Sequence, residues 1–195
     1  MQIKYVALGD SYTICEGSPQ SKSWPVILTE HLNVAEVDIK LVANPSVTGY
    51  TTHDVITKEY PVFDASNADF VTLCIGVNDW VRGSTNAEFK TNLIAILDHV
   101  QEKLGDKSKL ILLTIPDFSV TPTGKYYTNG KDASKGISEF NDIIKEQADL
   151  RKLKIVDLFE PSKAMGTDSS LVAGDGLHPS TKEYAIWETL ILPVA

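Results

Sequence analysis

The stretch "QIKYVALGDSYT", residues 2–13, joins an apolar, β-rich run to a turn that contains glycine, an acid and a serine. A nearly continuous apolar run is typical of a strand covered on both faces, and the polar turn marks its carboxyl end. Four further runs repeat the pattern, separated by longer segments with helical spacing. The five predicted strands are "QIKYVAL" (2–8), "VDIKLVA" (37–43), "DFVTLCI" (69–75), "KLILLTI" (109–115) and "KIVDLF" (154–159).

Amphipathic helices are predicted in the intervals between these strands. Thr85 with Glu88 starts one of them at a capping box, another runs from about 134 to 152, and Ser180 with Glu183 caps the last. Repeated strand-then-helix units predict an α/β fold, an open parallel sheet with helices on both sides. No repeat, low-complexity segment or linker divides the 195 residues, so we expect a single domain.

The composition is that of an ordinary soluble globular protein, with 43% hydrophobic and 23% charged residues. A formal net charge of −8 argues against nucleic acid or an anionic membrane as a partner. The two cysteines, Cys15 and Cys74, are too few for a disulfide framework. Cys74 lies in an apolar run and is expected to pack there, whereas Cys15 lies near Ser11, and a reactive thiol is the minor alternative.

No run approaches the ~20 apolar residues of a membrane-spanning helix, so no integral membrane segment is expected. The first strand begins almost at Met1, which leaves no room for a signal peptide. We therefore expect a cytoplasmic protein, with an exported protein that has lost its signal as the alternative. The oligomeric state is not indicated by the sequence.

Four polar, glycine-marked turns follow predicted strands. Because the carboxyl ends of parallel strands meet at one edge of a sheet, these turns are expected to lie close together. They are "GDS" (9–11), "NPSVTGYTT" (44–52), "GVND" (76–79) and "DGLHP" (175–179).

Ser11 and His178 are the residues in these turns with the most distinctive chemistry. A serine in a strand-to-helix turn can be an exposed nucleophile, although it can also simply cap the next helix. Asp175 stands three residues before His178, where its carboxylate can accept from Nδ1 and leave Nε2 as a base. Gly49 and Asn78 offer a backbone N–H and a side-chain amide for an oxyanion, although each is also an ordinary turn residue.

The four turns together resemble the sequence blocks of the SGNH hydrolases, also called GDSL esterases and lipases. Tyr12 replaces the leucine of the literal "GDSL", a common variation that leaves the catalytic positions intact. The matching residues, in the order of the family, are Ser11 in "GDSYT", Gly49 in "NPSVTGYTT", Asn78 in "GVND", and Asp175 and His178 in "GDGLHPS".

The resemblance implies a three-layer α/β/α sandwich with a five-stranded parallel sheet, flavodoxin-like, and the hydrolysis of carboxylic esters without a cofactor. Ser11 would be the nucleophile, His178 the base and Asp175 the residue that orients it. The backbone N–H groups of Ser11 and Gly49 and the amide of Asn78 would hold the oxyanion. The compact chain is most similar to the bacterial lysophospholipase or thioesterase-like branch. The expected partner is a small-molecule ester, and acetyl esters, sugar esters, lysophospholipids and thioesters all stay open.

A non-catalytic protein that binds an anion or other ligand is the main alternative, because flavodoxin-like sheets also hold phosphates in the turn after the first strand. The chain has no G-x-x-x-x-G-K-[ST] or G-x-G-x-x-G motif, however, and this alternative leaves Asn78, Asp175 and His178 without a role. A structural protein with a degenerate site is a third possibility. Cys/His metal spacing is absent, so no metal is expected and chelators should have no effect.

The irregular stretch 116–132 is long for a compact domain and is expected to be a functional loop or lid. Aromatic residues in and near it can line a substrate pocket or can equally cover the edge of the core. The candidate substrate contacts are Asp10, Trp80, Phe118, Tyr126 and Tyr127.

Overall fold

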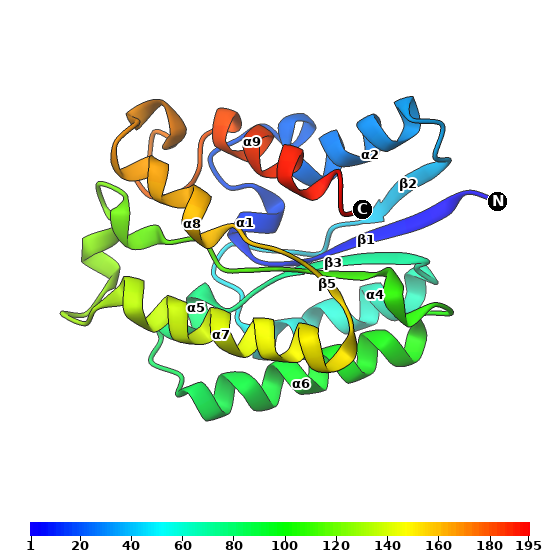
Figure 1. Cartoon of the computed structure of the whole chain (residues 1–195), viewed down its shortest axis with the longest axis horizontal. Helices are drawn as coiled ribbons and strands as arrows, with labels where there is room; N and C mark the ends of the chain where they lie inside the picture. The colour runs from blue at the N-terminus through cyan, green and yellow to red at the C-terminus, as the bar shows by residue number, and fades with distance from the viewer.

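The computed structural model describes residues 1–195 and has a five-stranded, fully parallel sheet at its centre (Figure 1). The strand order is β2-β1-β3-β4-β5. The chain adds β2 on one side of β1 and then crosses to add β3 on the other side, so the strand order reverses between β1 and β3. Open parallel sheets bind ligands at such a reversal. The strands lie within one residue of the predicted runs or inside them. Their bounds are β1 (Ile3–Gly9), β2 (Ile39–Ala43), β3 (Phe70–Cys74), β4 (Leu110–Leu113) and β5 (Lys154–Val156).

Helices cover both faces of the sheet and complete the expected three layers. In Figure 1, α1, α2, α8 and α9 lie above the sheet, and α4, α5, α6 and α7 lie below it. The central strands are covered on both sides, which is why their residues are apolar with little alternation. The helices are α1 (Ser11–Ile14), α2 (Trp24–Val34), α3 (Thr52–Asp54), α4 (Tyr60–Ser66), α5 (Val77–Val81), α6 (Asn86–Lys103), α7 (Ala133–Arg151), α8 (Phe159–Ser162) and α9 (Thr181–Ile191).

The predicted helix starts are present, but one of the two capping boxes forms only in part. Thr85 and Glu88 make both reciprocal bonds at the start of α6. At the start of α9, Ser180 accepts from the N–H of Glu183. The Glu183 carboxylate is buried and accepts instead from the indole N–H of Trp187, at 2.7 Å. A partner four residues along the same helix therefore takes the acid that the sequence pattern assigns to the cap.

Between β2 and β3 the chain forms one continuous helical segment, in which a five-residue π turn, η2 (Val55–Glu59), joins α3 to α4. Val55, Glu59 and Phe63 follow one another at intervals of four, and all three side chains are buried. The carboxylate of Glu59 accepts from the N–H of Gly9, at 3.1 Å. An acidic residue therefore stands on the inward face of this segment, directly beneath the end of β1.

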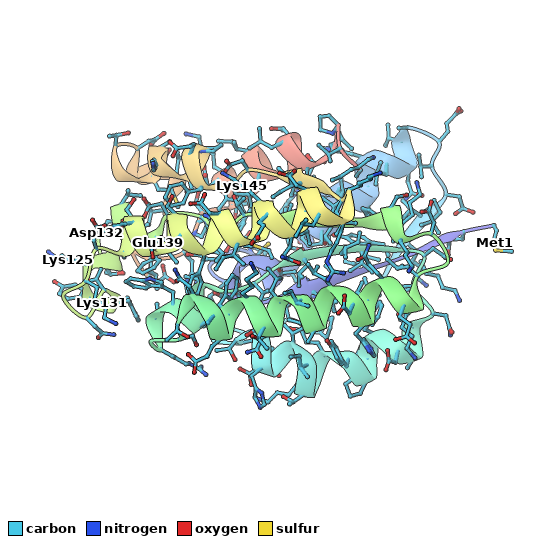
Figure 2. The ribbon with its side chains drawn as sticks, turned by 60° about the horizontal axis from the view of Figure 1, so that its bottom comes forward. Met1, Lys125, Lys131, Asp132, Glu139 and Lys145 are labelled. Atoms are coloured by element: carbon cyan, nitrogen blue, oxygen red, sulfur yellow. The ribbon has the colours of Figure 1, made fainter.

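The loop 116–132 contains two short 3-10 turns, η4 (Phe118–Val120) and η5 (Gly124–Tyr127). Its Thr123 N–H donates to the carbonyl of Gly176, at 2.9 Å, so the loop is joined to the turn that carries Asp175 and His178. Figure 2 shows Lys125 and Lys131 at the end of the molecule opposite Met1. None of the helices has both the length and the apolar character needed to cross a membrane.

Candidate active site

The turn after β1 is shaped by a close approach of backbone to backbone. A Cβ on Gly9 would lie 2.3 Å from the carbonyl oxygen of Cys74 and 2.2 Å from Oγ1 of Thr13. Only glycine fits between β3 and the start of α1, so the chain can turn sharply there. Asp10 then caps α1 by accepting from the N–H of Tyr12, at 3.0 Å, and Ser11 becomes the first residue of that helix.

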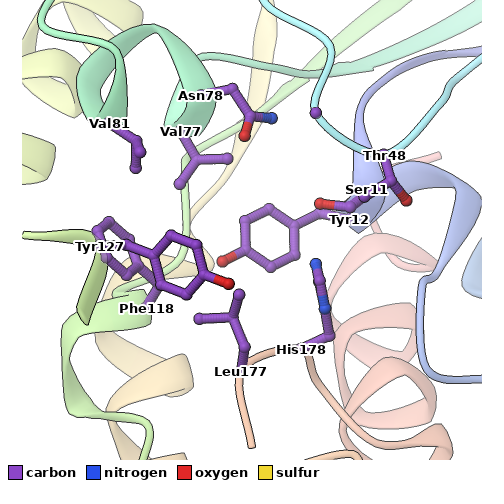
Figure 3. A pocket seen from close by; sticks show the side chains of 11 residues that line it. Ser11, Tyr12, Thr48, Val77, Asn78, Val81, Phe118, Tyr127, Leu177 and His178 are labelled. Atoms are coloured by element: carbon purple, nitrogen blue, oxygen red, sulfur yellow. The ribbon is translucent and has the colours of Figure 1, made fainter. Parts of the chain in front are cut away.

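Four of the five residues predicted to form the triad and the oxyanion site line one cavity of about 230 Å³ at the carboxyl ends of β1 and β3. These are Ser11, Gly49, Asn78 and His178. Polar residues lie on one side of the cavity and apolar residues on the other (Figure 3). The remaining lining residues are Tyr12, Thr48, Val77, Val81, Phe118, Tyr127 and Leu177.

Asp175 and His178 form a hydrogen-bonded pair, with 2.6 Å between Oδ2 and Nδ1. The other carboxylate oxygen accepts from the backbone N–H groups of Leu177 and His178, at 2.8 and 3.0 Å. Desolvation by itself would raise the pKa of Asp175, but the bonds from the imidazole and the two N–H groups outweigh it and lower the pKa. An ionised carboxylate only accepts, so Nδ1 carries the proton and Nε2 of the neutral ring is free to take one.

Ser11 and His178 face each other across the polar side of the cavity. In Figure 3 a ring nitrogen of His178 points toward Ser11. No hydrogen bond joins the two side chains, although both line the same space. Catalytic hydrogen bonds of this kind commonly tighten only when a substrate is bound.

Three residues that line this cavity from separate segments carry N–H groups that are not fully used within the protein. Ser11 is the first residue of α1, so its N–H has no acceptor within the helix. Gly49 has a φ of +87°, and its N–H donates to no other backbone group. One hydrogen of the Asn78 amide goes to the carbonyl of Tyr50, at 2.9 Å, and the second is left for a ligand.

Two carboxyl groups are buried beneath the Ser11 turn. Oδ2 of Asp10 and Oε1 of Glu59 are both fully enclosed without a hydrogen-bond partner. Burial raises the pKa of Asp10 to about 8 and that of Glu59 to about 8. Asp10 is predicted from the sequence to contact the substrate. In the structure Asp10 caps α1 and is not among the residues that line the cavity.

The aromatic candidates separate into three groups. Phe118 and Tyr127 line the cavity. Tyr126, from the same loop, is 73% exposed and lies outside the cavity lining. Trp80 is half-buried against Phe118, with 5.9 Å between ring centroids, and it too is outside the lining. Trp80 therefore covers an edge of the core, the alternative that the sequence left open.

The reactive thiol considered for Cys15 is disfavoured, and two further histidines are paired with acids. Cys15 is buried, and burial raises the pKa of its thiol, so a reactive thiolate is disfavoured at this position. His31 is paired with Glu188, and His99 with Asp64. No group of three or more His, Cys, Asp or Glu side chains could hold a metal ion.

Sequence reasoning missed two residues that contact this site, Glu59 and Arg82. Glu59 falls at helical spacing between the apolar residues Val55 and Phe63. An acid in an apolar stripe could have indicated a buried carboxyl group. Arg82 follows Asn78 by four residues, which places both on one side of a helix. Its guanidinium donates to the carbonyl of Gly49, at 2.7 Å.

The chain matches a known class of hydrolases. The model of the GDSL-like lipase/acylhydrolase family matches residues 7–186, and the chain belongs to this family. It is 24% identical over 176 residues to an arylesterase of Vibrio mimicus, covering 90% of this chain and 80% of the relative. It is 23% identical over 193 residues to esterase TesA of Pseudomonas aeruginosa, covering 95% and 86%. The structure of a lipase/acylhydrolase from Enterococcus faecalis superposes with a TM-score of 0.79 at 22% identity, covering 98% of this chain and 94% of that one.

Proposed function

We propose that the protein is a serine esterase, which hydrolyses carboxylic esters through an acyl-enzyme on Ser11. Family membership supports ester hydrolysis as the activity. The observation that carries the mechanism is the 2.6 Å bond between His178 and Asp175 at the wall of a cavity that Ser11 also lines. A serine becomes a useful nucleophile when a base with this kind of support can reach it.

In the first half of the reaction, Oγ of Ser11 attacks the acyl carbon and its proton passes to Nε2 of His178. The imidazolium that forms is stabilised by the ionised Asp175, whose lowered pKa favours the charged carboxylate. When the tetrahedral intermediate collapses, the bond to the alcohol oxygen breaks, and Nε2 returns its proton to the departing alcohol. The acyl group stays on Ser11 as an ester.

In the second half, a water molecule gives a proton to Nε2 and attacks the acyl-enzyme. Collapse of this second intermediate releases the carboxylic acid and returns the proton to Ser11. In both halves the negative charge develops on the former carbonyl oxygen. The N–H groups of Ser11 and Gly49 and the second amide hydrogen of Asn78 are the donors that we assign to this oxyanion.

The size of the cavity favours a short acyl group. Its volume of about 230 Å³ is below the roughly 300–1,000 Å³ of pockets for drug-sized ligands. Val77, Val81, Phe118 and Leu177 offer an apolar wall to the acyl chain. We therefore propose short-chain carboxylic esters as the preferred substrates.

The test is hydrolysis of p-nitrophenyl esters from acetate to a long-chain acyl group, with Ser11→Ala as the blank. We expect turnover that depends on Ser11 and is fastest on the short esters. A fluorophosphonate should label Ser11 in the parent protein and label His178→Ala far more slowly. Full activity of Ser11→Ala would refute the mechanism. Absence of both turnover and labelling in the parent protein would favour the alternative, a protein that binds an anion without cutting it.

A further inference from the structure

One short helix holds the turn that supplies Gly49. Side chains of α5 (Asn78 and Asp79) and of its C-cap, Arg82, bond to backbone groups of residues 49–52. All three bonds to this turn therefore come from the same helix. The bonds run from Nδ2 of Asn78 to the carbonyl of Tyr50 (2.9 Å), from the N–H of Thr52 to Oδ2 of Asp79 (2.9 Å), and from Nη2 of Arg82 to the carbonyl of Gly49 (2.7 Å).

Gly49 needs this support because glycine has the greatest backbone freedom of any residue. Its φ of +87° lies in the left-handed region, and among backbone groups the turn is closed only by the N–H of Tyr50 on the carbonyl of Val47, at 3.1 Å. An N–H donor stabilises an oxyanion to the extent that it is oriented before the reaction begins. The bond to the carbonyl of Gly49 fixes the peptide unit that follows the donor, so it restricts the ψ angle of Gly49.

Arg82 is well suited to this task. It lies four residues after Asn78, and its guanidinium is charged, so its bond to a carbonyl is stronger than one from a neutral donor. A second nitrogen, Nη1, lies 3.9 Å from the carboxylate of Asp54, which pairs more closely with Lys58, at 2.7 Å. The side chain is 60% exposed, so it contributes little to the core. The contact with Gly49 is its shortest polar contact.

We propose that Arg82 is a positioning residue for ester hydrolysis, which holds the Gly49 peptide so that its N–H meets the oxyanion. The assignment rests on the proposed function, because it gives Arg82 no role unless Gly49 is an oxyanion donor. Arg82 touches neither Ser11 nor His178, and it is not among the residues that line the cavity. Its effect should therefore appear in the chemical step rather than in the binding of the ester.

The experiment compares Arg82→Met, Arg82→Lys and Lys58→Met on p-nitrophenyl acetate. Active enzyme is counted by fluorophosphonate titration, so that a loss of folded protein does not alter the rates per site. We expect kcat of Arg82→Met to fall about tenfold with KM within about twofold, less than the ~10²–10³ for removing an oxyanion donor itself. Inhibition by a trifluoromethyl ketone, whose adduct with Ser11 carries the same oxyanion, should weaken by a similar factor. Arg82→Lys keeps a charged donor and should recover most of kcat.

Lys58→Met is the matched control. Lys58 is 54% exposed, pairs with Asp54 and lies over the ring of Tyr50, but it bonds to no backbone group of the turn. It should keep kcat within about twofold. An equal loss in Lys58→Met, or unchanged kcat and ketone inhibition in Arg82→Met, would overturn the assignment. Ser11→Ala distinguishes a failure of the proposed function from a failure of the role of Arg82. Activity that survives in Ser11→Ala refutes the proposed function. An inactive Ser11→Ala together with an unimpaired Arg82→Met refutes only the role of Arg82.

Discussion

Glu59→Gln should change how the stability of the protein responds to pH. The Glu59 carboxyl is fully buried, it accepts only the N–H of Gly9, and its Oε1 has no partner. Burial is the main cause that raises its pKa from 4.5 to about 8, with the nearby Asp10 adding to the shift. Glutamine has nearly the same shape, can accept the same N–H and never ionises. The substitution therefore removes the titration and leaves most of the packing.

The sign and the size follow from proton linkage. Between about pH 5 and pH 8 the folded chain keeps the proton of Glu59, whereas the unfolded chain has lost it. The unfolded state thus binds fewer protons, and the free energy of unfolding falls as pH rises, by about 1.4 kcal/mol per pH unit for one group. From pH 5.5 to pH 7.5 the titration of Glu59 lowers the free energy of unfolding of the parent protein by about 3 kcal/mol. The Glu59→Gln variant should not show this decrease.

Urea unfolding at pH 5.5 and pH 7.5, followed by tryptophan fluorescence, measures the effect. Trp24 and Trp187 are buried and should report loss of the fold. We expect the difference in free energy of unfolding, variant minus parent, to be about 3 kcal/mol more favourable at pH 7.5 than at pH 5.5, with equal m-values. Glu102→Gln, at an exposed site on α6, should change this difference by less than about 0.5 kcal/mol.

A difference that is the same at both pH values would refute the reasoning. It would mean that the carboxyl of Glu59 ionises in the folded chain at an ordinary pH, and so is stabilised by a donor or by solvent that reaches Oε1. A large loss of stability at both pH values would show instead that the amide cannot replace the carboxyl in its packing. The first outcome would remove the support for a neutral Glu59 beneath Ser11.

Three further predictions concern the catalytic residues and one helix cap. Asp175→Asn should lower kcat by roughly 10³–10⁴-fold at neutral pH, because the amide would donate to Nδ1 of His178 and favour the wrong tautomer; steady-state kinetics would show it. Asn78→Ala should lower kcat by about 10²–10³-fold with a small change in KM, measured on p-nitrophenyl acetate. Thr85→Ala removes the cap of α6 and should cost about 1 kcal/mol in urea unfolding, without an effect on kcat per active site.

The sheet could be predicted from the sequence because its central strands are buried on both faces. Their residues are apolar with almost no alternation, and polar turns with glycine mark their carboxyl ends. Ser11, Gly49, Asn78 and His178 could be brought together on paper for the same reason, since parallel strands deliver their following turns to one edge. The local spacing of three residues was enough to suggest that Asp175 faces His178, as the 2.6 Å bond has it.

Residues whose partners come from other segments could not be predicted in the same way. Trp80 follows the turn that carries Asn78, yet it packs on Phe118 and is not among the residues that line the cavity. The roles of Glu59 and Arg82 depend on contacts with Gly9 and Gly49, each more than 30 residues away.

The charges around Ser11 are arranged by the supply of hydrogen-bond donors. Asp175 receives three donors and has a lowered pKa, so it is ionised beside the ring on which positive charge appears. Asp10 and Glu59 are buried, and burial raises their pKa values because the one donor that each receives does not offset it, so they stay protonated at neutral pH beneath the turn where the proposed mechanism places negative charge. If either were ionised there, it would oppose the oxyanion at short range in a medium with little screening. Environments that separate the pKa values of neighbouring carboxyls in this way assign them different tasks. The neutrality of Glu59 is therefore as much a part of the proposed mechanism as the charge of Asp175.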